Sequence, residues 1–285
     1  MIAGMETEAR TSRRERCAEI IREAGRVVVA FSGGIDSTLV AKVARDILGS
    51  EAIAATAVSP SLAKADLEEA CALASAIGIE HRLIQSAETE KAEYQKNGPD
   101  RCYFCKDTAY DLFTALASAE GFSAVLDGTN ADDTGDHRPG RRAAREHGVL
   151  SPLQEAGLTK ADVREWAREL GLANWDKPAN ACLSSRVPFG MEVTPRKLAQ
   201  IEAAETALRS LGFRQCRVRH HDQVARVEIE SSQMDLAFAR RIEMAKVLKA
   251  AGFLYVSLDL EGFRSGSLNA ALAPQQREQS GPNGA

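Results

Sequence analysis

Three cysteines stand in polar stretches of the sequence where a thiol can do chemistry. Cys102 and Cys105 lie in the segment RCYFCK, and this Cys-x-x-Cys spacing lets two sulfurs meet one metal ion or form a redox pair. Cys182 lies in the loop-like segment ANACLSSR. Three thiolates can hold a four-iron cluster whose fourth iron has no protein ligand, and that open iron could carry an extra sulfide. The alternative for Cys102 and Cys105 is a pair at the start of a helix that binds no metal.

Cys182 is also a candidate nucleophile. Two serines and Arg186 follow it within four positions, and this electropositive setting favours the thiolate form. A nucleophilic or sulfur-donating cysteine is therefore expected here, with an inert loop thiol as the alternative. The other cysteines fall within predicted helices or a predicted strand, where they are expected to pack as small hydrophobic residues: Cys17, Cys71 and Cys216.

The segment SGGIDS follows an apolar run and precedes a helical pattern, which is the context that a phosphate-binding loop requires. Gly33 and Gly34 let the backbone turn sharply and approach an anion closely. Ser32, Ser37 and the N–H groups at the helix start can donate hydrogen bonds to a pyrophosphate. Asp36 would repel phosphate, so a magnesium ion between them is implied. The sequence contains neither GxxxxGK[ST] nor GxGxxG, and an exposed turn is the alternative for a bare Ser-Gly-Gly.

Charged side chains gather in three further places. Arg217 and Arg219 share one face of a predicted alternating strand, a spacing suited to gripping a phosphate or a carboxylate, with a solvated strand face as the alternative. The segment DHRPGRRAAREHG carries four arginines. Glu202 and Glu205 share a helical face at i and i+3, where they could act as acid or base, although we expect a solvated face.

Strands and helices alternate in the first part of the chain. Strands are expected at residues 27–31, 52–58, 80–84 and 124–127. Helices are expected at residues 11–24, 38–48, 64–77 and 106–120. This alternation predicts the α/β class, with a parallel sheet covered by helices on both faces.

The pattern changes after a segment at residues 176–190 that is rich in Pro, Gly, Ser and Asn, which we interpret as a functional loop and hinge. A helix capped by Thr159 precedes it. A long helix, two short strands, a second helix and a strand follow it, at residues 194–211, 216–220, 224–229, 232–251 and 255–260. We expect a first domain at 1–190, a small α+β domain for substrate binding or oligomerisation at 191–269, and a disordered tail at 270–285.

Composition excludes several classes of protein. The 285 residues are 44% hydrophobic and 27% charged, which is ordinary for a globular protein, and no apolar run is long enough to cross a membrane. The charged first twenty residues lack the apolar segment of a signal peptide, so we expect a cytoplasmic location and reduced thiols. A net charge of −4 disfavours a large nucleic-acid partner.

SGGIDS and the later segment LDGTNADD resemble the signature of the PP-loop ATP pyrophosphatases, which have a HUP-type α/β fold. Those enzymes cleave ATP to AMP and pyrophosphate while they adenylate a carbonyl oxygen of the substrate. The resemblance implies ATP as cofactor and magnesium held by Asp36, with Asp132 or Asp133 as helpers. It also implies that four residues line the nucleotide, although Asp-Gly alone is a common turn: Asp127, Gly128, Thr129 and Asn130.

Six segments together resemble a narrower group, the LarE sulfur transferases: SGGIDS, RCYFCK, LDGTNADD, DHRPGRRAAREHGVLSPL, ACLSSRVPFG and LDLEGFRSGSLN. The resemblance extends over residues 16–269. This family adenylates a carboxylate of pyridinium-3,5-biscarboxylic acid mononucleotide and converts it to a thiocarboxylate, a precursor of the nickel-pincer nucleotide of lactate racemase. It implies a small-molecule mononucleotide substrate, a homo-oligomer and hand-over of the product to a nickel-inserting partner.

Two sulfur sources are known in that family. In the sacrificial form a cysteine matching Cys182 attacks the acyl-adenylate and gives up its sulfur, leaving dehydroalanine. In the other form three cysteines hold a [4Fe-4S] cluster that carries a transferable sulfide. Because Cys102 and Cys105 accompany Cys182, we favour the cluster form. The residues expected to orient the phosphate or second carboxylate of the mononucleotide are Arg186, Arg217 and Arg219.

Three other functions compete with this interpretation. A tRNA-thiolating enzyme would share the PP-loop and the cysteine chemistry, but the acidic chain lacks a basic, aromatic-interleaved surface for RNA. A regulator that binds ATP without turning it over is a second alternative. An ammonia-using ligase is a third, but it gives Cys182 no role.

Overall fold

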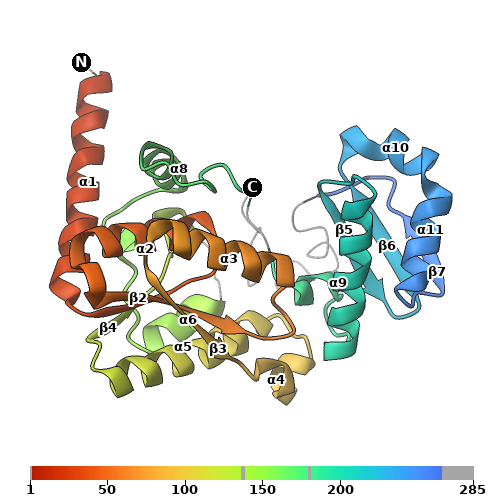
Figure 1. The fold of residues 1–285 in the computed structure, drawn as a ribbon, viewed down its shortest axis with the longest axis horizontal. Coiled ribbons are helices and arrows are strands. Elements are labelled where there is room, and N and C mark those ends of the chain that lie inside the picture. The colour runs from red at the N-terminus through yellow and green to blue at the C-terminus, as the bar shows by residue number, and fades with distance from the viewer. Residues whose placement is uncertain (1, 136–138, 179–180, 265–285) are drawn as a thin grey trace. The chain divides into compact units, whose positions relative to one another are not determined.

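The computed structural model describes residues 2–135, 139–178 and 181–264, and the predicted tail at 270–285 lies outside them. The chain divides into two compact units (Figure 1). Unit 1 comprises Met1–Ser59, Lys64–Glu88 and Cys102–Asn180, and unit 2 comprises Pro60–Ala63, Thr89–Arg101 and Ala181–Ala285. The domain boundaries placed at 190 and 269 from the sequence stay predictions.

Unit 1 is built on a four-stranded parallel sheet. Its strands are β1 (Val27–Ala30), β2 (Ala52–Val58), β3 (Glu80–Gln85) and β4 (Ala124–Leu126). They lie in the order β3-β2-β1-β4, so that β1 is central and pairs in parallel with both β2 and β4. Strands that run parallel need crossover connections, and helices provide them here. The predicted α/β class is confirmed.

Helices cover both faces of this sheet, as the strand β1 shows. Val27 and Val29 pack into a core with α1, α2, α3 and α8, whereas Val28 packs on the other face with Tyr110 and Phe113 of α5. Fully burying such a side chain stabilises the fold by about 1.5–3 kcal/mol. The helices involved are α1 (Ile2–Ala24), α2 (Ile35–Leu48), α3 (Lys64–Ile77), α5 (Arg101–Glu120), α6 (Pro139–Glu146), α7 (Pro152–Glu155) and α8 (Lys160–Glu169).

The predicted cap of α8 is present. The Thr159 hydroxyl accepts a hydrogen bond from the N–H of Asp162, and the Asp162 carboxylate accepts one from the N–H of Thr159, which completes a capping box. This arrangement fixes where α8 begins and therefore where Lys160, its first residue, lies.

Unit 2 has a small mixed sheet with helices α4 (Ala92–Gln95), α9 (Pro195–Ser210), α10 (Met234–Ala239) and α11 (Arg241–Ala250). Strands β5 (Cys216–His221) and β6 (Val224–Ile229) are antiparallel, and β7 (Tyr255–Leu258) pairs in parallel with β6. The prediction of a single helix at 232–251 is wrong, because the helix is interrupted at Arg240, between α10 and α11. The α+β character of this part is confirmed.

No helix within the described ranges is both long and apolar enough to cross a membrane.

Candidate functional site

The loop between β1 and α2 has the local geometry of an anion cradle. The Ser32 and Ser37 hydroxyls lie 3.1 Å apart, and the Ser37 hydroxyl also donates to the carbonyl of Gly34 at 3.1 Å. Gly33 has φ +70°, and a Cβ there would lie 3.0 Å from the Cβ of Ala70. Only glycine suits that position, because both the conformation and the space exclude a side chain.

A close approach of two backbones joins this loop to the second predicted segment. A Cβ on Gly128 would lie 2.6 Å from the backbone nitrogen of Ser37 and 2.9 Å from the carbonyl carbon of Asp36. The turn after β4 therefore lies directly against the first turn of α2, and no side chain would fit between them. The carboxyl ends of neighbouring parallel strands meet in this way, at the edge where α/β proteins bind ligands.

Asp36 is held by an amide and an ammonium group. The Asn130 side-chain amide donates to its Oδ1 at 3.1 Å, and the Lys160 Nζ lies 2.5 Å from its Oδ2. The Lys160 backbone N–H donates to Asp132 at 2.8 Å. Sequence reasoning missed Lys160, because 124 positions separate it from Asp36 and only the sheet topology brings them together.

The carboxylates expected to share a magnesium ion do not form one group. Asp132 and Asp133 accept hydrogen bonds from the N–H groups of Lys160 and Asn130, and they do not gather with Asp36 into a three-residue ligand set among the described residues. Magnesium typically binds one or two carboxylates together with substrate phosphates. The partly exposed Asp36 carboxylate beside the glycine loop fits that mode.

Asp127 is an organising residue of the second segment. Its Oδ1 accepts from the Thr129 N–H at 3.0 Å and the Ser151 hydroxyl at 2.7 Å, and its Oδ2 accepts from the Tyr110 and Thr129 hydroxyls at 2.9 Å each. Burial raises the pKa of Tyr110, which keeps that hydroxyl a neutral donor. With four donors on a buried carboxylate, Asp127 shapes the turn that Gly128 and Asn130 occupy.

The cysteines separate into exposed and buried groups. Cys102 is exposed and Cys105 half-buried in the first turn of α5 in unit 1, and Cys182 is exposed in unit 2. Burial raises the pKa of Cys17 to about 12 and that of Cys216 to about 11, which makes both thiols inert. Cys71 is partly exposed, so the expectation that it packs as a core residue holds only in part.

A separate histidine and carboxylate group lies between α5 and α6. His147 Nε2 is 3.0 Å from Asp107, and its Nδ1 is 3.7 Å from Asp111. These are the residues of the described ranges that bring three candidate metal-ligand atoms together. One ligand atom from each of the three residues lies within 4.8 Å of the other two, and exposed acidic groups of this kind are common without a metal ion.

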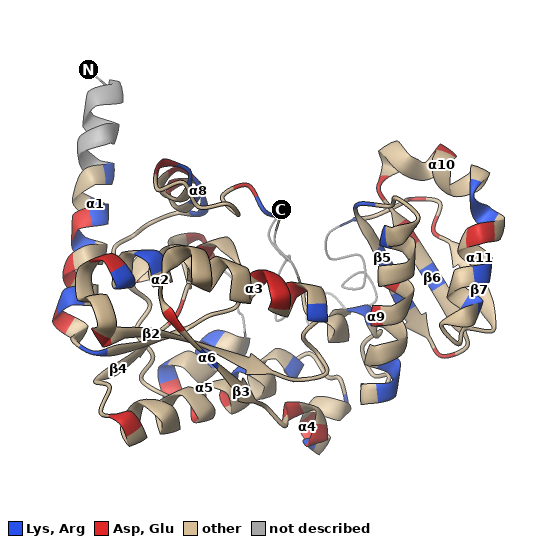
Figure 2. Cartoon of the chain, viewed as in Figure 1, with Lys and Arg blue, Asp and Glu red and all other residues tan. Residues whose placement is uncertain are grey.

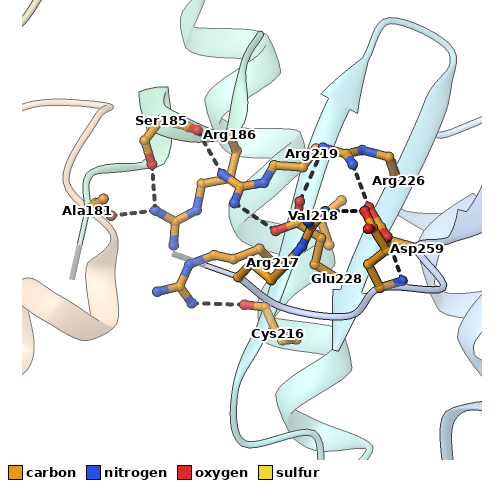
Figure 3. Close-up of polar contacts among 12 residues, drawn as sticks. Ala181, Ser185, Arg186, Cys216, Arg217, Val218, Arg219, Arg226, Glu228 and Asp259 are labelled. Carbon is orange, nitrogen blue, oxygen red and sulfur yellow. Dashed lines mark hydrogen bonds and ion pairs between the residues drawn. The ribbon is translucent and has the colours of Figure 1, made fainter. Parts of the chain in front are cut away.

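Arg186, one of the predicted substrate arginines, is bonded to the loop of Cys182 and to α9 (Figure 3). Its Nε and Nη2 donate to the two oxygens of Glu205 at 2.9 and 3.1 Å. Its Nη1 donates to the carbonyl oxygens of Ala181 and Cys182 and to the Ser185 hydroxyl. The solvated face expected for Glu205 is wrong, because α9 turns this carboxylate inward onto Arg186 with none of its residue surface exposed.

The charge of Glu205 is maintained by its partners. Burial acts to raise its pKa, but Arg186, through its charge and its hydrogen bonds, outweighs burial and holds the pKa below the ordinary value. The N–H of Val218 on β5 also donates to Glu205 at 3.1 Å. Glu205 therefore joins α9, β5 and the loop of Cys182 as a carboxylate.

Arg219 on β5 makes a second connection to the same loop. It donates to the Ser185 carbonyl at 2.9 Å and to Glu228 at 2.7 Å, and Arg226 pairs with both Glu228 and Asp259. Arg219 is buried, so it does not lie on a solvated strand face.

Arg217 completes what we call the arginine cluster. It donates to the carbonyl of Cys216 at 2.9 Å, and burial together with the nearby Arg186 charge lowers its pKa to about 10. Figure 2 marks the basic positions along β5, β6 and α9 in blue. The cluster joins five arginines and three carboxylates: Arg186, Arg209, Arg217, Arg219 and Arg226 with Glu205, Glu228 and Asp259. Its surplus of positive charge favours an anion.

Comparison with known proteins gives near full-length matches. An uncharacterized protein of Synechocystis sp. is 47% identical over 92% of this chain and 98% of its own length. A pyridinium-3,5-bisthiocarboxylic acid mononucleotide synthase of Lactiplantibacillus plantarum is 41% identical over 90% of this chain and 93% of its own length. An uncharacterized protein of Methanocaldococcus jannaschii is 31% identical over 84% of this chain and 91% of its own length.

A family model described as NAD synthase matches residues 17–109, the part of the chain that contains the glycine loop. Together with the match to the Lactiplantibacillus plantarum synthase, it confirms the resemblance that the motifs carry. This chain is an ATP-dependent sulfurtransferase of the PP-loop ATP pyrophosphatase type, and it belongs to the LarE family.

Proposed function

We propose that this protein adenylates a carboxylate of pyridinium-3,5-biscarboxylic acid mononucleotide with ATP and converts it to a thiocarboxylate, for nickel-pincer nucleotide biosynthesis. The name of the Lactiplantibacillus plantarum relative describes the doubly thiolated product of this chemistry. The observation that carries the proposal is the exposed Cys182, on a loop bonded to an arginine cluster with surplus positive charge. A thiol in such a setting suits attack on an activated acid group of an anionic substrate.

Unit 1 would perform the adenylation. A carboxylate oxygen of the substrate attacks the α-phosphorus of ATP, the bond between the α- and β-phosphates breaks, and pyrophosphate leaves with the electron pair. Ser32, Gly33, Gly34 and Ser37 would receive the pyrophosphate at the start of α2, where N–H groups and the helix dipole favour an anion. Magnesium at Asp36, when bound, would offset the phosphate charge. The turn around Gly128, organised by Asp127, would line the adenylate together with Thr129 and Asn130.

Unit 2 would supply the sulfur donor, Cys182, in the sacrificial form. Cys182 Sγ attacks the acyl carbon, the bond from that carbon to the phosphate oxygen breaks, and AMP leaves with the electron pair. Loss of the Cα proton and cleavage of the Cβ–Sγ bond then release the thiocarboxylate and leave dehydroalanine at position 182. This sequence consumes one polypeptide per sulfur.

We favour the cluster form, in which Cys102, Cys105 and Cys182 would ligate a [4Fe-4S] cluster. Thiolates are the ligands such clusters prefer, and these three thiols are more accessible than the buried Cys17 and Cys216. The cluster, when bound, would supply a transferable sulfide. Within unit 2, Arg101 donates to the Ser184 carbonyl at 2.9 Å, so the residue that precedes Cys102 is bonded to the loop that follows Cys182. This contact supports a shared role for the two segments.

Within the arginine cluster, direct contact with the substrate is proposed for Arg217. Burial, together with like charges nearby, leaves Arg217 with a lowered pKa, and an anionic group of the mononucleotide would compensate for those like charges. Arg186 and Arg219 contribute to the same positive field. The mononucleotide carries both a phosphate and carboxylates that suit such a site.

Further parts of the proposal concern partners and location. We propose a homo-oligomer, supported by the large apolar side chains that unit 2 exposes on α10 and α11, with Phe238 at 67% and Ile242 at 73% exposure. We further propose a cytoplasmic location, no nucleic-acid or membrane partner, and hand-over of the product to a nickel-inserting protein.

The test is to incubate anaerobically purified protein with ATP, magnesium and the mononucleotide, and to measure the masses of product and intact polypeptide together. A thiolated product with unchanged polypeptide mass is expected for the cluster form. A thiolated product with a polypeptide lighter by hydrogen sulfide would establish the sacrificial form instead. Pyrophosphate release that does not depend on the mononucleotide, with no thiolated product, would overturn the proposed function.

A further inference from the structure

The loop of Cys182 is held through its main chain by two buried guanidinium groups (Figure 3). Arg186 Nη1 donates to the carbonyls of Ala181 and Cys182, and Arg219 Nη1 donates to the carbonyl of Ser185. The amides of the same loop are also paired, since the N–H of Leu183 donates to the carbonyl of Ser61 at 2.9 Å. The backbone on both sides of the reactive thiol is therefore bonded.

The opposite ends of both arginines are fixed by buried carboxylates. Arg186 and Glu205 have side-chain exposures of 2% and 1%, and Arg219 and Glu228 of 7% and 0%. Each pair is anchored further, because Glu205 accepts from the Val218 N–H and Glu228 pairs with a second arginine. The loop is thus linked to α9 through Glu205 and to β6 through Glu228.

These contacts oppose a direct role of the two arginines in substrate binding. The Nε of Arg186 donates to Glu205, its Nη1 is within hydrogen-bond distance of three oxygens of the loop, and its Nη2 donates to Glu205 again. To turn these nitrogens toward a ligand, Arg186 would weaken its bonds to the loop carbonyls or to the buried Glu205. Leaving a buried carboxylate without its partner is strongly destabilising.

We propose that Arg186 and Arg219 are positioning residues, which hold the main chain of the Cys182 loop so that Cys182 Sγ keeps one position, whether it ligates the cluster or attacks the activated carboxyl. Neither residue would contact the mononucleotide. The inference rests on the proposed function only for the identity of the reaction, and the loop contacts exist without substrate. Misplacement of a reacting atom by about 1 Å can slow a reaction about a hundredfold, so fixing this loop has a large effect on rate.

The decisive variant is Arg186→Lys. Lysine keeps the positive charge, but one nitrogen cannot bond both oxygens of Glu205 and the loop carbonyls together. The matched control is Arg209→Lys, which alters the other arginine on Glu205, a residue with 39% side-chain exposure that bonds this carboxylate at 3.1 Å. Arg219→Lys is a second test variant that acts at Ser185 and keeps the proposal testable should Arg186→Lys fail to fold.

Hydrogen exchange of the substrate-free protein is the first measurement, followed by alkylation of Cys182 with iodoacetamide. In Arg186→Lys we expect the loop amides of Leu183, Ser185 and Val187 to exchange about tenfold faster, and alkylation to accelerate, because the loop opens more often. Arg219→Lys should accelerate both the amide exchange and the alkylation, but by less than Arg186→Lys. Arg209→Lys should change neither rate.

Affinity for the mononucleotide and the single-turnover rate of thiolation complete the test. In Arg186→Lys we expect the dissociation constant to stay within about twofold and the rate to fall about tenfold or more. Unchanged loop exchange with affinity weakened about tenfold would show a substrate contact and overturn the inference. Unchanged exchange with unchanged affinity would overturn it as well. If the wild-type protein makes no thiolated product, the proposed function fails, while the exchange and alkylation results still decide whether these arginines hold the loop.

Discussion

The glycine loop of unit 1 and the Cys182 loop of unit 2 are shaped by different means. In unit 1 the shape comes from backbone, because Gly33 and Gly128 allow approaches that no other residue permits. In unit 2 it comes from buried charge, through Arg186 and Glu205. A site made by backbone depends on small residues at fixed positions, whereas a site made by ion pairs depends on partners that are far apart in the sequence. The two kinds of site should therefore respond to substitution in different ways.

The largest effect is expected where a buried charge loses its partner. In Glu205→Ala, Arg186 would stay charged at 2% exposure, and breaking such a pair costs about 3–5 kcal/mol of unfolding free energy. In Arg209→Ala, which removes the more exposed partner of the same carboxylate, the loss should be about 0.2–1 kcal/mol. Urea denaturation measures both, and equal losses would contradict the distinction between buried and exposed pairs.

A smaller but more local effect is expected at the backbone contact of unit 1. The Cβ of Gly128→Ala would meet the Ser37 nitrogen at 2.6 Å, and because that neighbour is backbone it cannot rotate away. We expect a loss of about 2–3 kcal/mol of stability and a clear loss of ATP affinity. Gly148→Ala is the control, since no atom lies within 4 Å of its Cβ position and only its φ of +64° opposes the change. Thermal melting and calorimetric ATP titration test this, and wild-type ATP affinity in Gly128→Ala would refute the close approach.

Lys160 should matter for the reaction more than for stability. Lys160 and Asp36 are partly exposed, so Lys160→Met should cost about 0.2–1 kcal/mol of stability. Because the ammonium beside Asp36 lies next to the proposed phosphate cradle, ATP–pyrophosphate exchange should fall about tenfold. Lys42→Met removes a similar ion pair, with Asp46, on the exposed side of α2 and should leave exchange unchanged. Equal rates of ATP–pyrophosphate exchange in the two variants would show that Lys160 has no role in the proposed site.

The smallest predicted effect is a pH dependence in unit 2. Burial, with the Lys197 charge adding to it, lowers the pKa of His220, which packs against Phe253 with ring centres 5.1 Å apart. His220 therefore binds a proton more tightly in the unfolded chain than in the folded protein. The contribution of neutral His220 to folding stability is fully present above the unfolded pKa of about 6.5, and it is lost as the pH falls from there toward the folded pKa.

When the pH falls from about 7.5 to about 5.5, the unfolding free energy of His220→Gln should therefore drop by about 1 kcal/mol less than that of the wild type. Burial also lowers the pKa of His81 in unit 1, so the difference between the two proteins, rather than the wild-type slope, isolates His220. Urea denaturation at both pH values gives that difference, and parallel losses would contradict the burial argument.

Features carried by local sequence were predictable. The parallel sheet followed from alternating strands and helices, and the Thr159 cap followed from a residue type placed before an apolar pattern. The turn at Gly33 could be predicted for the same reason, since its conformation is set by neighbours in the chain. Such signals need no knowledge of which segments meet in space.

Features carried by long-range contacts were not predictable. The pairing of Lys160 with Asp36 depends on the sheet topology, and the burial of Glu205 depends on Arg186 arriving from a loop nineteen positions away. A pair of glutamates at i and i+3 is usually solvated, so the helix pattern alone predicted that this face is exposed to solvent. The membership of residues 89–101 in unit 2 has a similar cause, because the Asn97 side-chain amide donates to the carbonyl of Pro188 at 2.8 Å.

The proposed function places adenylation in unit 1 and sulfur transfer in unit 2, and Cys182→Ser would separate the two half-reactions. The measurement is pyrophosphate release and thiocarboxylate formation in the same reaction, with the mononucleotide present and absent. The account predicts that Cys182→Ser keeps mononucleotide-dependent pyrophosphate release and forms no thiocarboxylate. Thiocarboxylate formation by Cys182→Ser at the wild-type rate would contradict the account.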